Sequence, residues 1–299
     1  MKHKVLIVTG SMVSYQDKSL FQVLKKQMDS FKFSSGAWQD IQQKISASKH
    51  LLSQKKYRKT KSYKNSDYFH QIEAYFKDQQ NVITPQLTEV SLATLLSDEG
   101  LDFGVATFSE IYSNKALRTK LLKEHDCIFV STSLIRDLSE LLPLLRLLKT
   151  PNNRLVIGGA LTGALHNSWQ GLKEVDIFAV GYGEYLVSSI ADWIKSDYQT
   201  INPPAYGRIV EKDFGFILYS GVPNSRDLDH LRLPDWSIAD KVHDQKFTMV
   251  HYESVRGCPY RCSFCNYPYL FDDKVFRYRS AEQIAKDWQS YSERGVKYI

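Results

Sequence analysis

The segment Lys4-Val-Leu-Ile-Val-Thr9 is a run of apolar residues that ends in the small polar turn Gly10-Ser11. Such a run is typical of a parallel strand that is buried on both faces and delivers a loop at its carboxyl end. Similar apolar runs recur along the first two thirds of the chain. We expect strands there at residues 101–108, 127–131, 154–159 and 175–180.

Leucine-rich segments with helical spacing separate these strands. We expect helices from about Thr84-Pro85 to Gly100, at 115–125, at 138–148 and at 184–194. Strands that alternate with helices predict an α/β fold with a doubly wound parallel sheet, because each right-handed crossover needs a helix to return the chain. Residues 1–195 would form this Rossmann-like domain.

Ligands of such sheets bind outside the carboxyl ends of the strands, near the point where the strand order reverses. In the flavodoxin-like order 2-1-3-4-5, that point falls between the first and third strands. Thr9-Gly10-Ser11 and Ser131-Thr132-Ser133 would then face each other across a crevice. Gly158-Gly159, after the fourth strand, would allow a ligand to approach the backbone closely.

Residues from about 20 to 81 interrupt this pattern as a polar, partly aromatic insertion. Its basic run at 55–64 contains two tyrosines, and basic residues with aromatics can mark a nucleic-acid surface. We favour a solvated helix face or a mobile loop as the explanation of this run, because no RNA-binding motif accompanies it. We therefore expect no nucleic-acid partner.

The length and composition predict a soluble globular chain of mixed composition. A length of 299 residues allows one large or two ordinary domains, and the formal net charge is +6. Neither a signal peptide nor a membrane-spanning apolar stretch is recognisable, so we expect a cytoplasmic protein with no membrane partner. Cys127 lies in an apolar run and is expected to be a small buried hydrophobe.

The other three cysteines lie in the loop Arg256-Gly-Cys-Pro-Tyr-Arg-Cys-Ser-Phe-Cys-Asn266, at the spacing C-x3-C-x2-C. Three thiolates this close can hold three corners of a cubane iron–sulfur cluster. The fourth iron would lack a protein ligand and could bind something else. A zinc site is the alternative, but a structural zinc needs a fourth ligand, and no further C-x2-C or H-x3-H pair nearby supplies one.

This loop resembles that of the radical S-adenosylmethionine enzymes, whose motif is C-x3-C-x-(aromatic)-C. The resemblance implies a 4Fe-4S cluster on Cys258, Cys262 and Cys265. S-adenosylmethionine would bind the open iron, with Phe264 beside its adenine, and reductive cleavage would release a deoxyadenosyl radical. It also implies an external electron donor of the flavodoxin or ferredoxin type and a small-molecule or peptide substrate.

The first domain is similar to the cobalamin-binding domain of the cobalamin-dependent members of that family. The similarity rests on Pro85 with its leucine helix, on Ile157-Gly158-Gly159, and on Gly181-Tyr-Gly183-Glu184. It implies that cobalamin binds at the crevice described above and at Gly183 and Glu184. No D-x-H-x-x-G string occurs, so a bound cobalamin would lack that histidine on cobalt.

Residues 196–245 are rich in proline and charge and predict a connecting segment. Residues 246–299 would begin a radical S-adenosylmethionine domain, a partial TIM barrel with a first strand at 247–253, a helix capped by Ser280 with Gln283, and a further strand at 296–299. Because such a domain needs more strand–helix units, we expect a fragment or a truncated gene product, inactive alone and protease-sensitive after about residue 245.

The sequence therefore predicts a radical S-adenosylmethionine enzyme, coupled through methylcobalamin to methyl transfer onto an unactivated substrate atom. One alternative is the same chemistry with an empty cobalamin-type domain. A second is a non-catalytic cofactor-binding module. A methylthiotransferase of transfer RNA is disfavoured, since those enzymes carry a second cysteine triad and this chain has only Cys127 besides the loop.

Overall fold

The computed structural model of the chain describes residues 3–10, 13–14, 83–167, 172–260, 262–265, 267, 270, 273 and 275–299. The predicted basic insertion and the predicted ligand residue Ser11 lie outside them. The chain divides into two compact units, and the larger comprises 1–12, 84–137 and 141–299. β2 (Val13–Ser14) and β3 (Ile83–Thr84) form a separate two-stranded pair.

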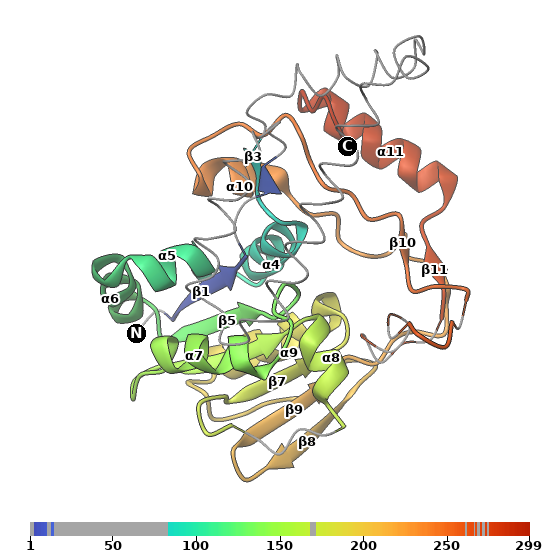
Figure 1. Cartoon of the computed structure of the whole chain (residues 1–299). Coiled ribbons are helices and arrows are strands. Elements are labelled where there is room, and N and C mark those ends of the chain that lie inside the picture. Colours follow the sequence, from blue (N-terminus) through green and yellow to red (C-terminus); the bar gives the residue numbers. More distant parts are fainter. Residues whose placement is uncertain are drawn as a thin grey trace, which may run out of the picture. The chain divides into compact units, whose positions relative to one another are not determined.

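Within the described residues, seven strands form one sheet in the order β4, β1, β5, β6, β7, β9, β8 (Figure 1). All neighbours are parallel except β8, which runs antiparallel to β9. The five predicted strands have the flavodoxin-like order, so that prediction is confirmed. The strands are β1 (Lys4–Thr9), β4 (Asp102–Thr107), β5 (Cys127–Ser131), β6 (Arg154–Gly158), β7 (Ile177–Val180), β8 (Arg208–Lys212) and β9 (Gly215–Tyr219).

Both faces of the sheet are buried, as the apolar runs predicted. Successive side chains of a strand point to opposite faces, and alternate residues of β1 accordingly enter two different cores. Leu6 and Val8 pack with leucines of the helix at 138–148, whereas Val5 and Ile7 pack on the side of the helices at 87–98 and 183–195. The sheet is therefore doubly wound.

Eight helices are described. They are α4 (Leu87–Asp98), α5 (Phe108–Ser113), α6 (Lys115–Glu124), α7 (Leu138–Leu148), α8 (Ala160–Leu165), α9 (Gly183–Lys195), α10 (Trp236–Val242) and α11 (Ala281–Glu293). The sequence predicted α4, α6, α7, α9 and α11 but not the three shortest ones. Among these described helices, none combines the length and apolar character needed to cross a membrane.

Several predicted helix ends have the expected local chemistry. The Ser280 hydroxyl accepts a hydrogen bond from the Gln283 amide at 3.1 Å and so caps α11. Gly100 follows α4 with φ +70°, a left-handed conformation that glycine adopts without steric cost. Pro85 lies just before the first turn of α4, where Gln86 is the N-cap residue.

The segment 196–245, which the sequence predicted to be a connection, contains β8, β9 and α10. In the hairpin of β8 and β9, Lys212 pairs with Gly215 across a two-residue turn. Strand β9 pairs in parallel with β7 and so extends the sheet. The short apolar run Phe216-Ile-Leu-Tyr219 is the signal that could have predicted β9. The prolines and charged residues around it favoured a connecting segment instead.

The barrel strand predicted at 247–253 does not form. This segment makes only an isolated parallel bridge, between Met249 and Tyr298. Phe247 and Val250, three residues apart, are both buried in a small cluster with Trp236 of α10 and Tyr291 of α11. A spacing of three does not fit the two-residue period of a strand, so this segment crosses the cluster as irregular chain. The partial TIM barrel is not confirmed.

Candidate functional site

The loop that carries the three cysteines is closed at its base by a short antiparallel pair. Strand β10 (Val255–Arg256) pairs with β11 (Arg277–Tyr278), and the residues between them include all three cysteines. Gly257 begins the loop with φ +78°, and a Cβ there would lie 2.5 Å from the Val275 carbonyl oxygen. Only glycine fits this close approach, so the two ends of the loop are held together.

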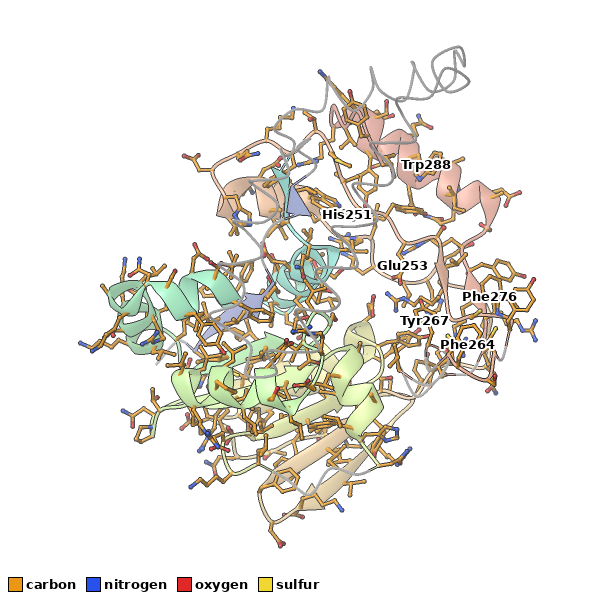
Figure 2. The ribbon with its side chains drawn as sticks, in the orientation of Figure 1. His251, Glu253, Phe264, Tyr267, Phe276 and Trp288 are labelled. Carbon is orange, nitrogen blue, oxygen red and sulfur yellow. The ribbon has the colours of Figure 1, made fainter. Side chains whose placement is uncertain are left out.

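All three loop cysteines are free thiols. Cys258 and Cys265 are half-buried and Cys262 is exposed, while the Cys265 amide donates to the Cys262 carbonyl at 3.1 Å. The fourth cysteine, Cys127, is buried in β5. Phe264, predicted to contact adenine, has 90% of its surface exposed, and Figure 2 shows it on this loop.

The donor set fits an iron–sulfur cluster, because three free thiols on one short segment are the usual ligands of such clusters. In the described part of the chain, however, no group of three or more His, Cys, Asp or Glu side chains is arranged to hold a metal ion. The three thiols are therefore not gathered here. Binding of a cluster would require the loop to draw them together.

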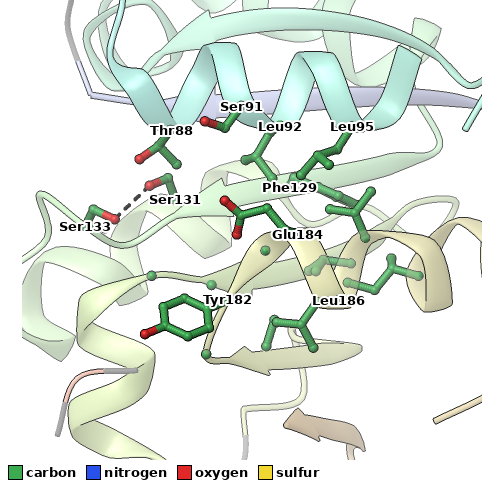
Figure 3. A pocket seen from close by; sticks show the side chains of 18 of the residues that line it. Thr88, Ser91, Leu92, Leu95, Phe129, Ser131, Ser133, Tyr182, Glu184 and Leu186 are labelled. Atoms are coloured by element: carbon green, nitrogen blue, oxygen red, sulfur yellow. Dashed lines mark hydrogen bonds between the residues drawn. The ribbon is translucent and has the colours of Figure 1, made fainter. Parts of the chain in front are cut away.

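A cavity opens at the carboxyl edge of the sheet, between α4 and α9 (Figure 3). Its volume is about 240 Å³, and it opens to solvent, so it approaches the lower end of the size range of small-molecule sites. Register pairs such as Ser131 with Gly158 and Gly158 with Ala179 bring the ends of β5, β6 and β7 to this edge.

The cavity has an apolar part and a polar part. Leucines of α4 and α9, with Phe129, Val156 and Ala179 of the sheet, form the apolar part. Polar groups come from α4, from the end of β5 and the residues after it, from the first turn of α9 and from the segment that leads into the cysteine loop. They are Thr88, Ser91, Ser131, Ser133, Glu184, Glu253 and Arg256.

The structure brings together six of the residues predicted to bind cobalamin. These residues line the cavity: Ser131, Ser133, Gly158, Gly159, Gly183 and Glu184. Gly158 leaves room for a Cβ, which would meet only Ala179 at ordinary van der Waals distances. Gly159 does not, because its φ is +114° and a Cβ would lie 2.9 Å from the Ser133 amide nitrogen.

Three other predicted residues do not line it. The Thr9 hydroxyl donates to Glu89 Oε2 at 3.1 Å, and the Thr132 hydroxyl donates to the Gly158 carbonyl at 2.9 Å. Gly10 is covered by Gln86 and Leu134, whose side-chain atoms lie 2.4 and 2.5 Å from where a Cβ would stand. The chain's own groups thus fill the expected crevice after β1, and the cavity lies further along the sheet.

The sequence did not reveal the role of Arg256, although this residue opens the cysteine loop. Its guanidinium forms two hydrogen bonds to the Glu184 carboxylate, at 2.5 and 3.1 Å, and a third to Glu253 at 2.7 Å. It also lies 4.7 Å from the centre of the Tyr182 ring. Burial raises the pKa of Glu184, but the charge and hydrogen bonds of Arg256, a backbone hydrogen bond and the Arg279 charge together outweigh burial, and the pKa is lowered overall. Both groups are therefore charged at neutral pH.

A second contact joins the same turn to the other end of the loop. The Tyr182 hydroxyl donates to Asp273 Oδ2 at 2.7 Å, and Arg277 Nε donates to the same oxygen at 2.6 Å. Burial and the adjacent Asp273 raise the pKa of Tyr182, so its hydroxyl stays protonated. The turn Gly181–Glu184 thus contacts both arms of the cysteine loop while it lines the cavity.

Comparisons of this chain with protein-family models, with curated proteins and with solved structures found no match. Within its described residues the chain is an α/β protein with a mostly parallel seven-stranded sheet, flanked by helices. Its cavity lies where ligands of such sheets bind.

Proposed function

We propose that this chain is the cofactor-binding part of a radical S-adenosylmethionine enzyme, with a 4Fe-4S cluster on Cys258, Cys262 and Cys265. The proposal rests on one observation above all. Three free cysteines at C-x3-C-x2-C spacing share a loop that directly follows Arg256, and Arg256 is hydrogen-bonded to Glu184 of the cavity lining. A cluster held there supplies the electron for reductive cleavage of S-adenosylmethionine.

The chain's own residues position the loop in this proposal. Gly257 permits the close approach of the two loop ends, and Arg256 fixes the first arm through two carboxylates. Phe264 is exposed and so is available to cover a flat ring. Cys127 is too deeply buried in the sheet to serve as a fourth ligand, which leaves one iron for a small molecule.

The experiment is anaerobic reconstitution with iron and sulfide, followed by metal and sulfide analysis. We expect about four irons per chain. Replacing the three loop cysteines with alanine should abolish the brown chromophore, whereas Cys127→Ala, the matched control, should keep it. A full cluster in the triple variant, or one zinc per chain in place of iron, would overturn the proposal in favour of another site or the zinc alternative.

The cavity is proposed to hold cobalamin for methyl transfer to an unactivated substrate atom. Its apolar part between α4 and α9 can take a flat heteroaromatic base, and its serines can bond amide groups. No histidine is among the described residues that line it. Cobalt would therefore receive no histidine from the cavity lining.

Binding of hydroxocobalamin tests this assignment. The wild-type chain should retain it with the absorption spectrum of the base-off form. Gly158→Leu should weaken binding at least tenfold, because Gly158 lines the cavity and a leucine side chain there would compete with the ligand for space. Circular dichroism and thermal unfolding verify that the variant folds. Folded wild-type protein that retains no cobalamin would favour the empty-domain alternative. Absence of both cofactors would favour a non-catalytic module.

A further inference from the structure

The charges in the cavity lining are unbalanced. Among the described residues that line it, the charged side chains are two carboxylates, Glu184 and Glu253, and one guanidinium, Arg256. Nε of Arg256 donates to Glu253, and both of its terminal nitrogens donate to Glu184. An anion that entered the cavity would therefore meet an excess of negative charge and an arginine that is already paired with two carboxylates.

The start of α9 is the part of the cavity where an anion would otherwise bind. Ligands of parallel sheets bind at the carboxyl ends of the strands, and their phosphates lie at helix N-termini, where backbone N–H groups lack a partner within the helix. Helix α9 begins at Gly183, which lines the cavity. Its N-cap residue, Tyr182, donates its hydroxyl to Asp273 and does not cap the helix.

The Glu184 carboxylate takes this place. Glu184 lies in the first turn of α9, and Figure 3 shows its side chain extending toward α4. Against the opposing effect of burial, the charge and hydrogen bonds of Arg256, a backbone hydrogen bond at Glu184 itself and the Arg279 charge lower its pKa, so the carboxylate is charged at neutral pH. The helix dipole also favours a negative charge in the first turn. Glu184 thus uses the donors that a phosphate would need.

We propose that Glu184 is a specificity-determining residue that excludes anionic groups from the cavity. The ligand is an organic molecule without a phosphate or carboxylate in the part that lies against the start of α9, in contrast to the dinucleotides that sheets of this kind often bind. A repulsive group is a common means of discriminating between ligands. The inference does not rest on the proposed function. For the proposed cobalamin, it requires the phosphodiester to lie away from the start of α9.

The measurement is calorimetric titration of the full chain with inorganic phosphate at constant ionic strength. The wild-type chain should show no saturable binding. Glu184→Ala exposes the start of α9 and releases two paired nitrogens of Arg256, so phosphate should bind at least about tenfold more tightly than the wild-type limit, the contribution of one hydrogen bond to a charged group. Glu184→Gln removes the charge at nearly constant volume and should change binding in the same direction. Thermal unfolding verifies that each variant folds.

Two controls locate the binding that is gained. Glu99 pairs at 2.8 Å with Lys195, the last residue of α9. Glu99→Ala therefore removes the same charge outside the described cavity lining and should gain no phosphate binding. Adding Arg256→Gln to Glu184→Ala should weaken the gained binding.

Four results would overturn the inference. They are phosphate binding to the wild type as tight as to Glu184→Ala, no gain in either folded Glu184 variant, an equal gain in Glu99→Ala, or unchanged binding in the double variant. Failure of the chain to take up a cluster or cobalamin would instead count against the proposed function and would leave these phosphate titrations unaffected.

Discussion

Cys127 and the loop cysteines differ in environment although they belong to one chain. Cys127 is fully buried in β5, and burial raises the pKa of its thiol well above the usual value. A buried thiol of this kind is inert, whereas accessible thiols react as thiolates. The expectation that Cys127 is a packing residue is confirmed by its place in the core on the α4 and α9 side of the sheet.

Alkylation of the native chain should therefore label the loop and spare Cys127. With iodoacetamide at pH 8 in the absence of metal, we expect Cys262 to react first and Cys127 only after denaturation. Mass spectrometry of tryptic peptides gives the rate at each site. Labelling of Cys127 in the folded chain as fast as Cys262 would contradict this prediction.

His125 gives the stability of the sheet a dependence on pH. It is buried, its Nδ1 bonds to the Leu121 carbonyl at 2.8 Å, and its Nε2 has no hydrogen-bond partner among the described residues. Burial lowers the pKa of this imidazole, and the Lys4 charge adds to the effect, against the smaller opposing effects of the Leu121 bond, Glu124 and Asp126. In the folded state the ring therefore stays neutral below its ordinary pKa.

Because the unfolded chain binds this proton near its ordinary pKa of about 6.5, and the folded chain only at lower pH, the free energy of unfolding should fall as the pH drops below about 6.5. One proton gives at most about 1.4 kcal/mol per pH unit. Urea unfolding between pH 7 and 5.5 should show a smaller loss in His125→Leu than in the wild type. His251, whose pKa burial also lowers, remains in both proteins. Equal losses would exclude His125 as the source.

Among the elements, the hairpin of β8 and β9 belongs to the sheet and is not merely a connecting segment. Adjacent residues of β9 enter both cores, Ile217 on the α7 side and Leu218 on the side of α4 and α9. A strand buried on both faces next to β7 is part of the folded unit. Ile209 on the edge strand β8 pairs with Leu218 but is only half-buried.

We expect Leu218→Ala to lower the free energy of unfolding by about 2–5 kcal/mol, the usual cost of deleting a buried leucine. Ile209→Ala, on the edge, should cost clearly less. Urea denaturation with a constant m-value measures both. A change below about 1 kcal/mol for Leu218→Ala would mean that β9 behaves as a linker despite its pairing with β7.

The sequence predicted the five inner strands and their order because long apolar runs, each followed by a helical pattern, leave few alternatives. Helices α5 and α8 are six residues long, which is less than two turns, so they show no helical period. The segment 247–253 looked like a strand, but packing of Phe247 and Val250 against Trp236 overrides that pattern. Such an override depends on residues distant in the chain.

Some of the predicted site residues line the cavity, and others do not. Residues at the ends of β5 and β6, including Ser131 and Gly158, line the cavity because the fold itself brings strand ends together. Thr9 and Thr132 do not, since their hydroxyls bond to Glu89 and to the Gly158 carbonyl. Contacts of Arg256 with Glu184 link positions far apart in sequence, and no local pattern encodes them.

At the scale of the whole molecule, a third core supports the segments on either side of the cysteine loop. Trp236 of α10 packs against Phe247, with ring centres 6.4 Å apart, and shares its cluster with Tyr291 of α11 and Val90 of α4. The Asp235 amide also donates to the Thr94 hydroxyl of α4 at 2.8 Å. Its buried residues belong to neither of the two cores that flank the sheet. We therefore expect residues 236–299 to open before the sheet does, although the core also contacts α4.

Trp236→Ala should therefore loosen residues 236–299 and leave the sheet intact. Trp236 is 1% exposed, and removal of such a side chain costs about 3–5 kcal/mol. Because proteins open in separate units whose stabilities differ, hydrogen exchange should become faster in α10 and α11 while β1, β5 and β6 keep their protection. Leu233→Ala, on a half-buried member of the same cluster, should have a weaker effect of the same kind. An equal increase of exchange in β5 and in α11 would show instead that the sheet and the cysteine-loop region unfold together, as one cooperative unit.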